Sequence, residues 1–184
     1  MSQFHKKNLS IIAEIGSVHD GSFGNAIKLI DLTKECGADI VKFQMHIPEE
    51  ETLDSAPSPE YFKNEQRFEY FERIKFNKDQ WTKLYKYSKK KKIKFMVSPF
   101  SEKALDILLE TGIDYIKVAS GEVTNFSLLE KIVHSNIPCV LSTGMSDWNE
   151  IDSAIKILKK GNLAAIMQCS SIYPCPINKI GINI

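Results

Sequence analysis

The chain has 184 residues, 43% of them hydrophobic, with 24 basic against 23 acidic side chains and a net charge of +1. This composition is typical of one soluble folded domain and argues against disorder and against nucleic-acid binding, which normally depends on a clustered basic excess. No apolar run reaches the roughly 18 residues that a membrane span requires, so no membrane association is expected.

Six short apolar runs, rich in β-branched residues, predict strands that are buried on both faces. Segments with helical periodicity lie between them, and several of these end at a glycine, as at Gly37, Gly112 and Gly161. In chain order, the predicted strands are residues 10–15, 40–43, 93–97, 115–118, 138–141 and 164–167, and clear helical patterns cover residues 26–33, 105–109 and 151–158.

The alternation of strands and helices predicts a parallel sheet, because parallel strands need crossover helices. A doubly wound sheet is an alternative, but Gly16, Gly21 and Gly24 do not have the Gly-x-Gly-x-x-Gly spacing of its first turn. We therefore predict an α/β fold of the (β/α)8 TIM-barrel type, incomplete here because residues 1–184 supply about six of the eight units.

A long insertion, from about residue 45 to residue 77, separates the second and third predicted strands. Two interpretations are open: a surface excursion with its own small apolar cluster, or a lid over the mouth of a barrel. The insertion carries Pro48, Pro57 and Pro59, followed by the aromatic residues Tyr61, Phe62, Phe68, Tyr70, Phe71 and Phe76.

Polar side chains are dense where the predicted strands end, which is the end of a TIM barrel that carries the active site. Six strand ends therefore supply the candidate site residues. They are Glu14, Ser17, His19 and Asp20; Lys42 and Gln44; Ser98 and Ser101; Lys117, Ser120 and Glu122; Ser142 and Thr143; and Gln168, Ser170, Ser171 and Tyr173.

Lys42 and Lys117 are the most informative of these residues, because an ammonium group among apolar neighbours is costly to desolvate unless it meets an anion. One interpretation is a pair of internal salt bridges to Glu14 and Glu122. The other is a pair of cations that converge on a phosphate or carboxylate ligand at the barrel mouth.

The remaining reactive side chains point to no further chemistry. His19 is expected to be a loop hydrogen-bonding residue, since the other histidines make no recognisable metal-ligand cluster with it. The four cysteines form no CxxC pair, so we expect a cytoplasmic protein, and Cys169 and Cys175 are expected to be packing residues because no adjacent histidine would activate them. The lysine run 89–92 is expected to be a solvated helix end.

Taken together, the motifs resemble the sialic acid (N-acetylneuraminate) synthase family, including relatives that make legionaminic or pseudaminic acid or act in coat polysaccharide synthesis. The resemblance depends on the identity, order and spacing of motifs that cover nearly the whole chain. They are residues 11–16 and 19–22, 37–44, 98–100, 117–122, 141–145 and 169–174.

The resemblance implies that phosphoenolpyruvate condenses with an open-chain N-acyl hexosamine such as N-acetylmannosamine, giving a sialic-type acid and phosphate. It also implies a role for each matching position, with Ser98 and Ser171 as further substrate contacts. Lys42, Lys117, Ser120 and Ser142 would hold the phosphate and carboxylate of phosphoenolpyruvate, Gln44 and Tyr173 would face the sugar, and Glu14 and Glu122 would be the acid/base and orienting carboxylates.

The resemblance further implies a divalent metal, manganese or magnesium, whose two histidine ligands belong to the seventh and eighth strand regions. We expect those strands, and the antifreeze-like domain on which the family homodimer depends, to lie outside this chain. Val18, Gln168 and Ser171 depart from the residues usual in the family, which leaves the identity of the sugar open.

Three functional hypotheses follow. The first is a synthase whose activity requires the missing part. The second is a non-catalytic remnant that binds an anionic metabolite through Lys42 and Lys117. The third is another phosphoenolpyruvate-condensing enzyme that acts on a phosphorylated sugar, which would need further basic residues.

Overall fold

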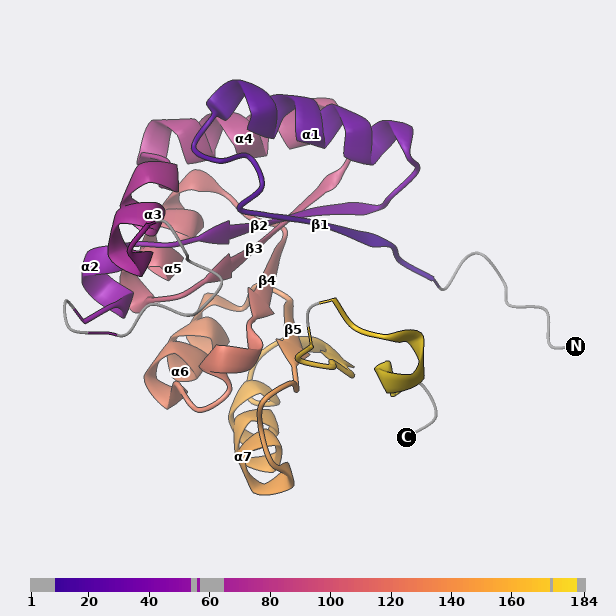
Figure 1. Cartoon of the computed structure of the whole chain (residues 1–184). Helices are drawn as coiled ribbons and strands as arrows, with labels where there is room; N and C mark the ends of the chain where they lie inside the picture. Colours follow the sequence, from indigo (N-terminus) through magenta and orange to yellow (C-terminus); the bar gives the residue numbers. More distant parts are fainter. Residues whose placement is uncertain (1–8, 54–55, 57–64, 173, 182–184) are drawn as a thin grey trace, which may run out of the picture.

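The computed structural model describes residues 9–53, 56, 65–172 and 174–181, and its centre is a six-stranded parallel sheet (Figure 1). The strands follow one another across the sheet in chain order, which confirms the predicted α/β, barrel-type arrangement of strand and helix units. The strands are β1 (Ile12–Gly16), β2 (Ile40–Met45), β3 (Lys94–Pro99), β4 (Tyr115–Val118), β5 (Cys139–Ser142) and β6 (Leu163–Met167).

The crossover helices begin at side chains that cap their free backbone amides. Two of them, α4 and α7, start with a complete capping box, formed by Asn77 with Gln80 and by Asp147 with Glu150. The helices are α1 (Phe23–Glu35), α2 (Pro48–Glu51), α3 (Arg67–Ile74), α4 (Lys78–Lys90), α5 (Glu102–Thr111), α6 (Phe126–Ser135) and α7 (Trp148–Leu158), with short 3-10 helices η2 (Ser120–Glu122) and η3 (Ile177–Lys179).

Side chains alternate along each strand, so successive residues point to opposite faces of the sheet. One face is apolar throughout, and the other becomes polar toward the carboxyl ends of the strands. On β2, Val41, Phe43 and Met45 face the helices and belong to the main hydrophobic core. The opposite face of the sheet carries a small apolar layer of Ile40, Met96 and Val140. The next positions toward the carboxyl ends of the strands are polar, so chemistry-bearing side chains emerge from this face.

The two edge strands differ from the prediction that all six strands are buried on both faces. In β1, Ile12 and Ala13 are only partly buried and Glu14 is exposed. Residues 164–167 of β6 are exposed, with Ile166 at 47% and Met167 at 36% of full exposure. Within the described part of the chain, β6 lies at one edge of the sheet and pairs only with β5. The apolar pattern of a strand therefore predicted its conformation correctly but not its burial. Among the described residues, no helix is long and apolar enough to cross a bilayer.

The insertion after β2 forms two helices, α2 and α3, beside the carboxyl ends of the first strands (Figure 1). Helix α3 is joined to the β1–α1 turn by Arg73, whose Nη1 lies 2.7 Å from Asp20 Oδ1. Phe71 and Phe76 are buried, while Pro57, Pro59, Tyr61 and Phe62 lie outside the described residues. The insertion is thus anchored at the functional end of the sheet, and its role as a lid stays a prediction.

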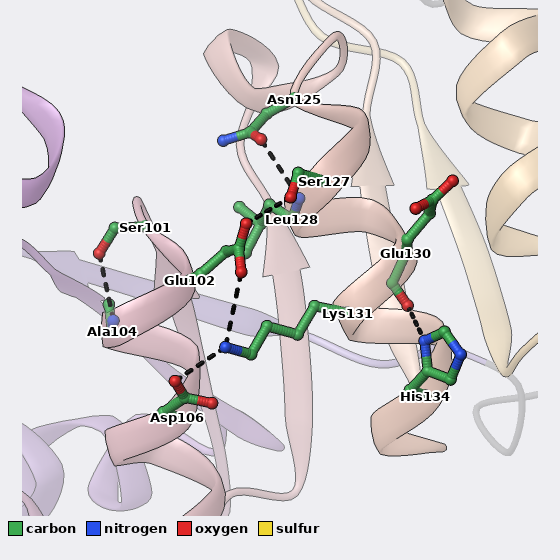
Figure 2. A network of polar contacts seen from close by, with 10 residues as sticks. All are labelled: Ser101, Glu102, Ala104, Asp106, Asn125, Ser127, Leu128, Glu130, Lys131 and His134. Atoms are coloured by element: carbon green, nitrogen blue, oxygen red, sulfur yellow. Dashed lines mark hydrogen bonds and ion pairs between the residues drawn. The ribbon is translucent and has the colours of Figure 1, made fainter.

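Polar contacts also join neighbouring crossover helices. Lys131 of α6 reaches Asp106 and Glu102 of α5 at 2.8 Å and 3.6 Å (Figure 2). Ser101 and Asn125 cap the same two helices through the backbone amides of Ala104 and Leu128. The lysine run forms the carboxyl end of α4, where Lys89 and Lys90 are exposed, which confirms the expected solvated helix end. Lys89 also pairs there with Asp114.

The tight contact at Gly21 gives a test of how the insertion is anchored. Gly21 has φ +75°, and a Cβ atom there would lie 2.7 Å from the backbone oxygen of Arg73. We expect Gly21→Ala to lower the free energy of unfolding by about 2 kcal/mol or more in urea titrations, because it adds backbone strain to a clash. Gly24→Ala is the control: a Cβ there meets only ordinary contacts, and a loss as large as that of Gly21→Ala would contradict the prediction.

Candidate functional site

A pocket of about 580 Å³ lies at the carboxyl ends of the strands, on the polar face of the sheet. It brings together eight of the ten residues to which the family resemblance gives a catalytic or substrate-binding role. These are Glu14, Lys42, Gln44, Ser98, Lys117, Ser120, Ser142 and Ser171.

Lys42 forms an internal salt bridge in this pocket. Strands β1 and β2 place Glu14 opposite Lys42, and Lys42 Nζ lies 2.6 Å from Glu14 Oε2. The lysine side chain is only 7% exposed, whereas that of Glu14 is 51% exposed. The salt-bridge interpretation is therefore correct for this pair, and the carboxylate also faces the open side of the pocket.

Lys117 has no such carboxylate. Its Nζ contacts Ser142 Oγ and donates to the Val118 carbonyl oxygen at 3.2 Å, and it forms no ion pair with any residue that the structure describes. Burial and the nearby Lys42 ammonium lower the pKa of Lys117 to about 8. The bridge from Lys117 to Glu122 that the salt-bridge interpretation requires is not formed, so this ammonium is held at the pocket without an ion pair among the described residues.

Hydroxyl groups surround the two lysines. Ser98 Oγ is buried and has no hydrogen-bond partner in the described part of the chain. Gly144 lets two other hydroxyls gather, because a Cβ there would lie 2.5 Å from Ser171 Oγ and 2.9 Å from Ser120 Oγ. The pocket therefore combines buried positive charge with hydroxyl donors, which is a suitable environment for an anion.

Glu122 and Tyr173 are the two remaining candidates. Glu122 is not among the residues that line the pocket; it accepts a hydrogen bond from Asn125 Nδ2 at 2.8 Å. Burial and the neighbouring Glu51 carboxylate raise the pKa of Glu122. Tyr173 lies outside the described residues.

His19 has the structural role expected from the sequence. Its Nδ1 accepts the Gly21 amide hydrogen at 3.2 Å, and its ring stacks on Phe76 with centroids 4.4 Å apart. Burial lowers its pKa to about 4, so the ring is neutral at pH 7. Over the described ranges, no three or more His, Cys, Asp or Glu side chains are grouped to hold a metal ion, and no chemical step is assigned to one.

Sequence reasoning missed two groups at this end of the sheet. Cys169 Sγ lies 3.3 Å from Ser142 Oγ, beside the pocket rather than in a packed core. His46 and Glu51 form a buried pair next to Gln44. The position of His46 could have been noticed, because the period of two that aligns Lys42 with Gln44 also extends to His46.

Comparison with known proteins gives a consistent result. The model of the NeuB family matches residues 29–184. The chain is 33% identical to an N,N'-diacetyllegionaminic acid synthase of Campylobacter jejuni, over 97% of this chain and 56% of that protein. It is 31% identical to an N-acetylneuraminate-9-phosphate synthase of Homo sapiens, over 95% of this chain and 50% of that protein. The chain thus spans about half the length of these curated relatives.

Solved structures agree with the sequence comparisons. A sialic acid synthetase from Leptospira borgpetersenii, solved with citrate, superposes with a TM-score of 0.79 at 30% identity, covering 93% of this chain and 57% of that one. A truncated 3-deoxy-D-arabino-heptulosonate 7-phosphate synthase from Thermotoga maritima superposes with a TM-score of 0.61 at 16% identity, covering 85% of this chain and 49% of that one. The second match shows a shared fold alone.

The Lys117 ammonium, which forms no ion pair with a described residue, is expected to lower the stability of the ligand-free fold. Because its pKa is about 8 in the folded chain and 10.5 in the unfolded reference, folding is penalised by about 3 kcal/mol below pH 8. We therefore expect Lys117→Met to raise the free energy of unfolding at pH 7 by about 1–3 kcal/mol, allowing for the hydrogen bonds that it removes.

The penalty disappears as pH rises from 8 toward 10.5, where the unfolded chain retains the proton that the folded chain has lost. Urea unfolding at pH 7 and pH 10 should therefore give a smaller stabilisation at the higher pH. Lys103→Met, at an exposed position of α5, should change stability by less than about 0.5 kcal/mol at both pH values. A variant at Lys117 that is less stable than wild type at pH 7 would contradict the analysis.

Proposed function

We propose, from the premise that this chain belongs to the NeuB family, that it provides the phosphoenolpyruvate site of a sialic-type acid synthase. The reaction is condensation of phosphoenolpyruvate with an open-chain N-acyl hexosamine, such as N-acetylmannosamine, to give a nonulosonic acid and phosphate. The observation that carries the proposal is the convergence of Lys42, Lys117 and buried hydroxyls in one pocket.

Charge supports phosphoenolpyruvate as the ligand. Its phosphate and carboxylate are anionic, and Lys117 has no carboxylate partner among the described residues. An anion in the pocket would compensate this buried charge and would accept a hydrogen bond from Ser98, whose hydroxyl has no partner in the described part of the chain. Ser120 and Ser142 line the same pocket and offer further hydroxyl donors.

The proposed chemistry forms one carbon–carbon bond. The methylene carbon of phosphoenolpyruvate attacks the sugar aldehyde carbon, and the aldehyde oxygen takes up a proton. Water then adds at C2 of the phosphoenolpyruvate unit and loses a proton. Phosphate leaves with cleavage of its C–O bond, while the new C2 hydroxyl becomes the ketone and gives up its proton. Glu14 is our proposed acid/base group, because its carboxylate is half exposed in the pocket beside Lys42.

The remaining roles belong to the same proposal. Gln44 and Ser171 line the pocket and would contact the sugar, as would Tyr173, while Glu122 would be an orienting carboxylate outside the pocket wall. A divalent manganese or magnesium ion would be bound by ligands other than the described residues. A homodimer and a cytoplasmic location are further proposals for a full-length form.

The lining of the pocket favours an unphosphorylated sugar over a phosphorylated one. Lys42 and Lys117 are the basic residues among its described lining, and both are assigned to phosphoenolpyruvate. A second phosphate would need additional cations. The alternative of a non-catalytic binder of anionic metabolites shares the same two lysines, so turnover rather than binding separates it from a synthase.

Binding of phosphoenolpyruvate is the first test. We expect Lys117→Ala to weaken binding by at least about 30-fold in isothermal titration calorimetry, since it removes the unpaired cation from the pocket. Lys103→Ala, which removes an exposed lysine of α5, should bind like wild type. An unchanged affinity for Lys117→Ala would overturn the assignment of the phosphoenolpyruvate site.

Turnover is the second test. Phosphate release from phosphoenolpyruvate would be measured with manganese and N-acetylmannosamine, on the 184-residue chain and on a longer form that carries the remaining barrel units. We expect release that requires both the metal and the sugar in the longer form. A longer form that binds phosphoenolpyruvate but releases no phosphate with any N-acyl hexosamine would favour the non-catalytic binder.

A further inference from the structure

The side chain of His46 is enclosed between two aromatic rings just beyond the end of β2. Its ring stacks on Phe71 of α3 with centroids 3.8 Å apart and on Phe100, after β3, with centroids 4.1 Å apart. The interplanar angles are 17° and 20°. The plane of the imidazole is therefore fixed by packing from both sides, and only its edge is available for polar contacts.

Both ring nitrogens of His46 have a polar neighbour. Nδ1 lies 2.7 Å from Glu51 Oε1 of α2, and each of these two side chains is only 5% exposed. Nε2 lies 3.4 Å from Gln44 Oε1. A carboxylate can only accept, so Glu51 holds a proton on Nδ1. Gln44 Oε1 is an acceptor too, so Nε2 either carries a second proton that it donates to Oε1 or accepts from the amide group of Gln44 in the flipped orientation. In both states the imidazole decides which end of the carboxamide faces it.

Gln44 connects this buried pair to the pocket. Its side chain lines the pocket, and Ser17 Oγ donates to its Oε1 at 3.4 Å from the opposite side. Because side chains alternate along a strand, Lys42, Gln44 and His46 project to the same side of β2. A continuous series of contacts thus leads from α2 in the insertion, through His46, to a carboxamide at the pocket wall.

Burial of this pair is unfavourable for folding by itself. An imidazole and a carboxylate lose their hydration in the interior, and Glu51 Oε2 has no hydrogen-bond partner in the described part of the chain. Apolar side chains of similar volume would serve as well in holding α2 against the sheet. A purely structural contact therefore does not require these residue types, whereas orientation of a neighbouring amide does.

We propose that His46 and Glu51 are positioning residues that hold the carboxamide of Gln44 in one orientation for the acceptor sugar. The assignment of Gln44 to the sugar rests on the function proposed above. A carboxamide has a donor end and an acceptor end, and a single fixed neighbour such as His46 Nε2 determines which end turns toward the ligand. The pair acts through Gln44 and does not touch the substrates itself.

Two variants with opposite expectations separate positioning from packing. The double variant His46→Phe/Glu51→Met keeps the aromatic stack and removes both polar groups, so Gln44 loses its neighbour and neither member of the pair is left buried without the other. Glu51→Gln keeps an oxygen that can accept from Nδ1 and should behave like wild type. Glu50→Met is the matched control, since Glu50 is an exposed residue of the same helix.

The first readout is the mobility of the Gln44 side-chain amide, measured by 15N relaxation on the 184-residue chain. In wild type, Glu51→Gln and Glu50→Met we expect a restrained amide, similar to that of Gln80, which is held by Asn77. In the double variant the Gln44 order parameter should fall below about 0.6, the range of flexible groups, while that of Gln80 stays unchanged. A Gln44 amide that remains restrained in the double variant would overturn the proposal.

A second readout needs no variant. Long-range 1H–15N correlation of the His46 ring in the wild-type chain should show a proton on Nδ1, the nitrogen that faces Glu51. A ring that carries its proton on Nε2 alone would contradict the role given to Glu51. This measurement stands even if the double variant does not fold.

Ligand titrations distinguish the failure of this inference from failure of the proposed function. Phosphoenolpyruvate should bind wild type and the double variant within about twofold, because its lysines are untouched. N-acetylmannosamine added to the phosphoenolpyruvate-saturated chain should bind the double variant about tenfold more weakly. If wild type does not bind phosphoenolpyruvate, the proposed function is wrong. If the double variant has a mobile Gln44 but binds the sugar as tightly as wild type, the orientation of Gln44 does not serve sugar binding and the further inference is wrong.

Discussion

A buried ammonium that has no carboxylate partner among the described residues is the constraint from which the other features of the site follow. Lys117 projects from the centre of a parallel sheet, where its charge is poorly solvated and the neighbouring Lys42 adds repulsion. In the described chain, the Lys117 ammonium contacts the Ser142 hydroxyl and donates to the Val118 carbonyl oxygen. Its side chain also lines the open pocket. Such an arrangement is unfavourable for folding by itself, and the proposed anionic ligand would offset this cost on binding.

Much of this arrangement could be predicted from the sequence, because it depends on local patterns. The period of two along β2 and β4 fixes which side chains leave the helix-covered face, and the carboxyl ends of parallel strands meet at one edge of the sheet. Those two rules bring Glu14, Lys42 and Lys117 into one pocket without knowledge of any other contact. The helix ends at Gly112 and near Gly37 follow from equally local chemistry.

The remaining features depend on tertiary contacts that no local pattern encodes. The partner of Lys117 was ambiguous because Glu122 begins a loop whose direction is set by η2 and by its bond to Asn125. The exposure of β6 depends on its place at the sheet edge rather than on its apolar residues. The environment of His46 is built from three separate segments, α2, α3 and the end of β3, that meet only in the folded chain.

The order of the strands has a consequence for how the chain acquires its structure. Each strand pairs with the strand that precedes it in the chain, from β1 to β6. Every newly synthesised strand and helix unit therefore finds its docking edge already formed, and the separations between pairing residues stay short except across the insertion. Folding can then advance from the amino end as the ribosome releases the chain. The pocket is lined by residues from β1 through β5 and by Ser171 after β6, so it can assemble only after all six strands are in place.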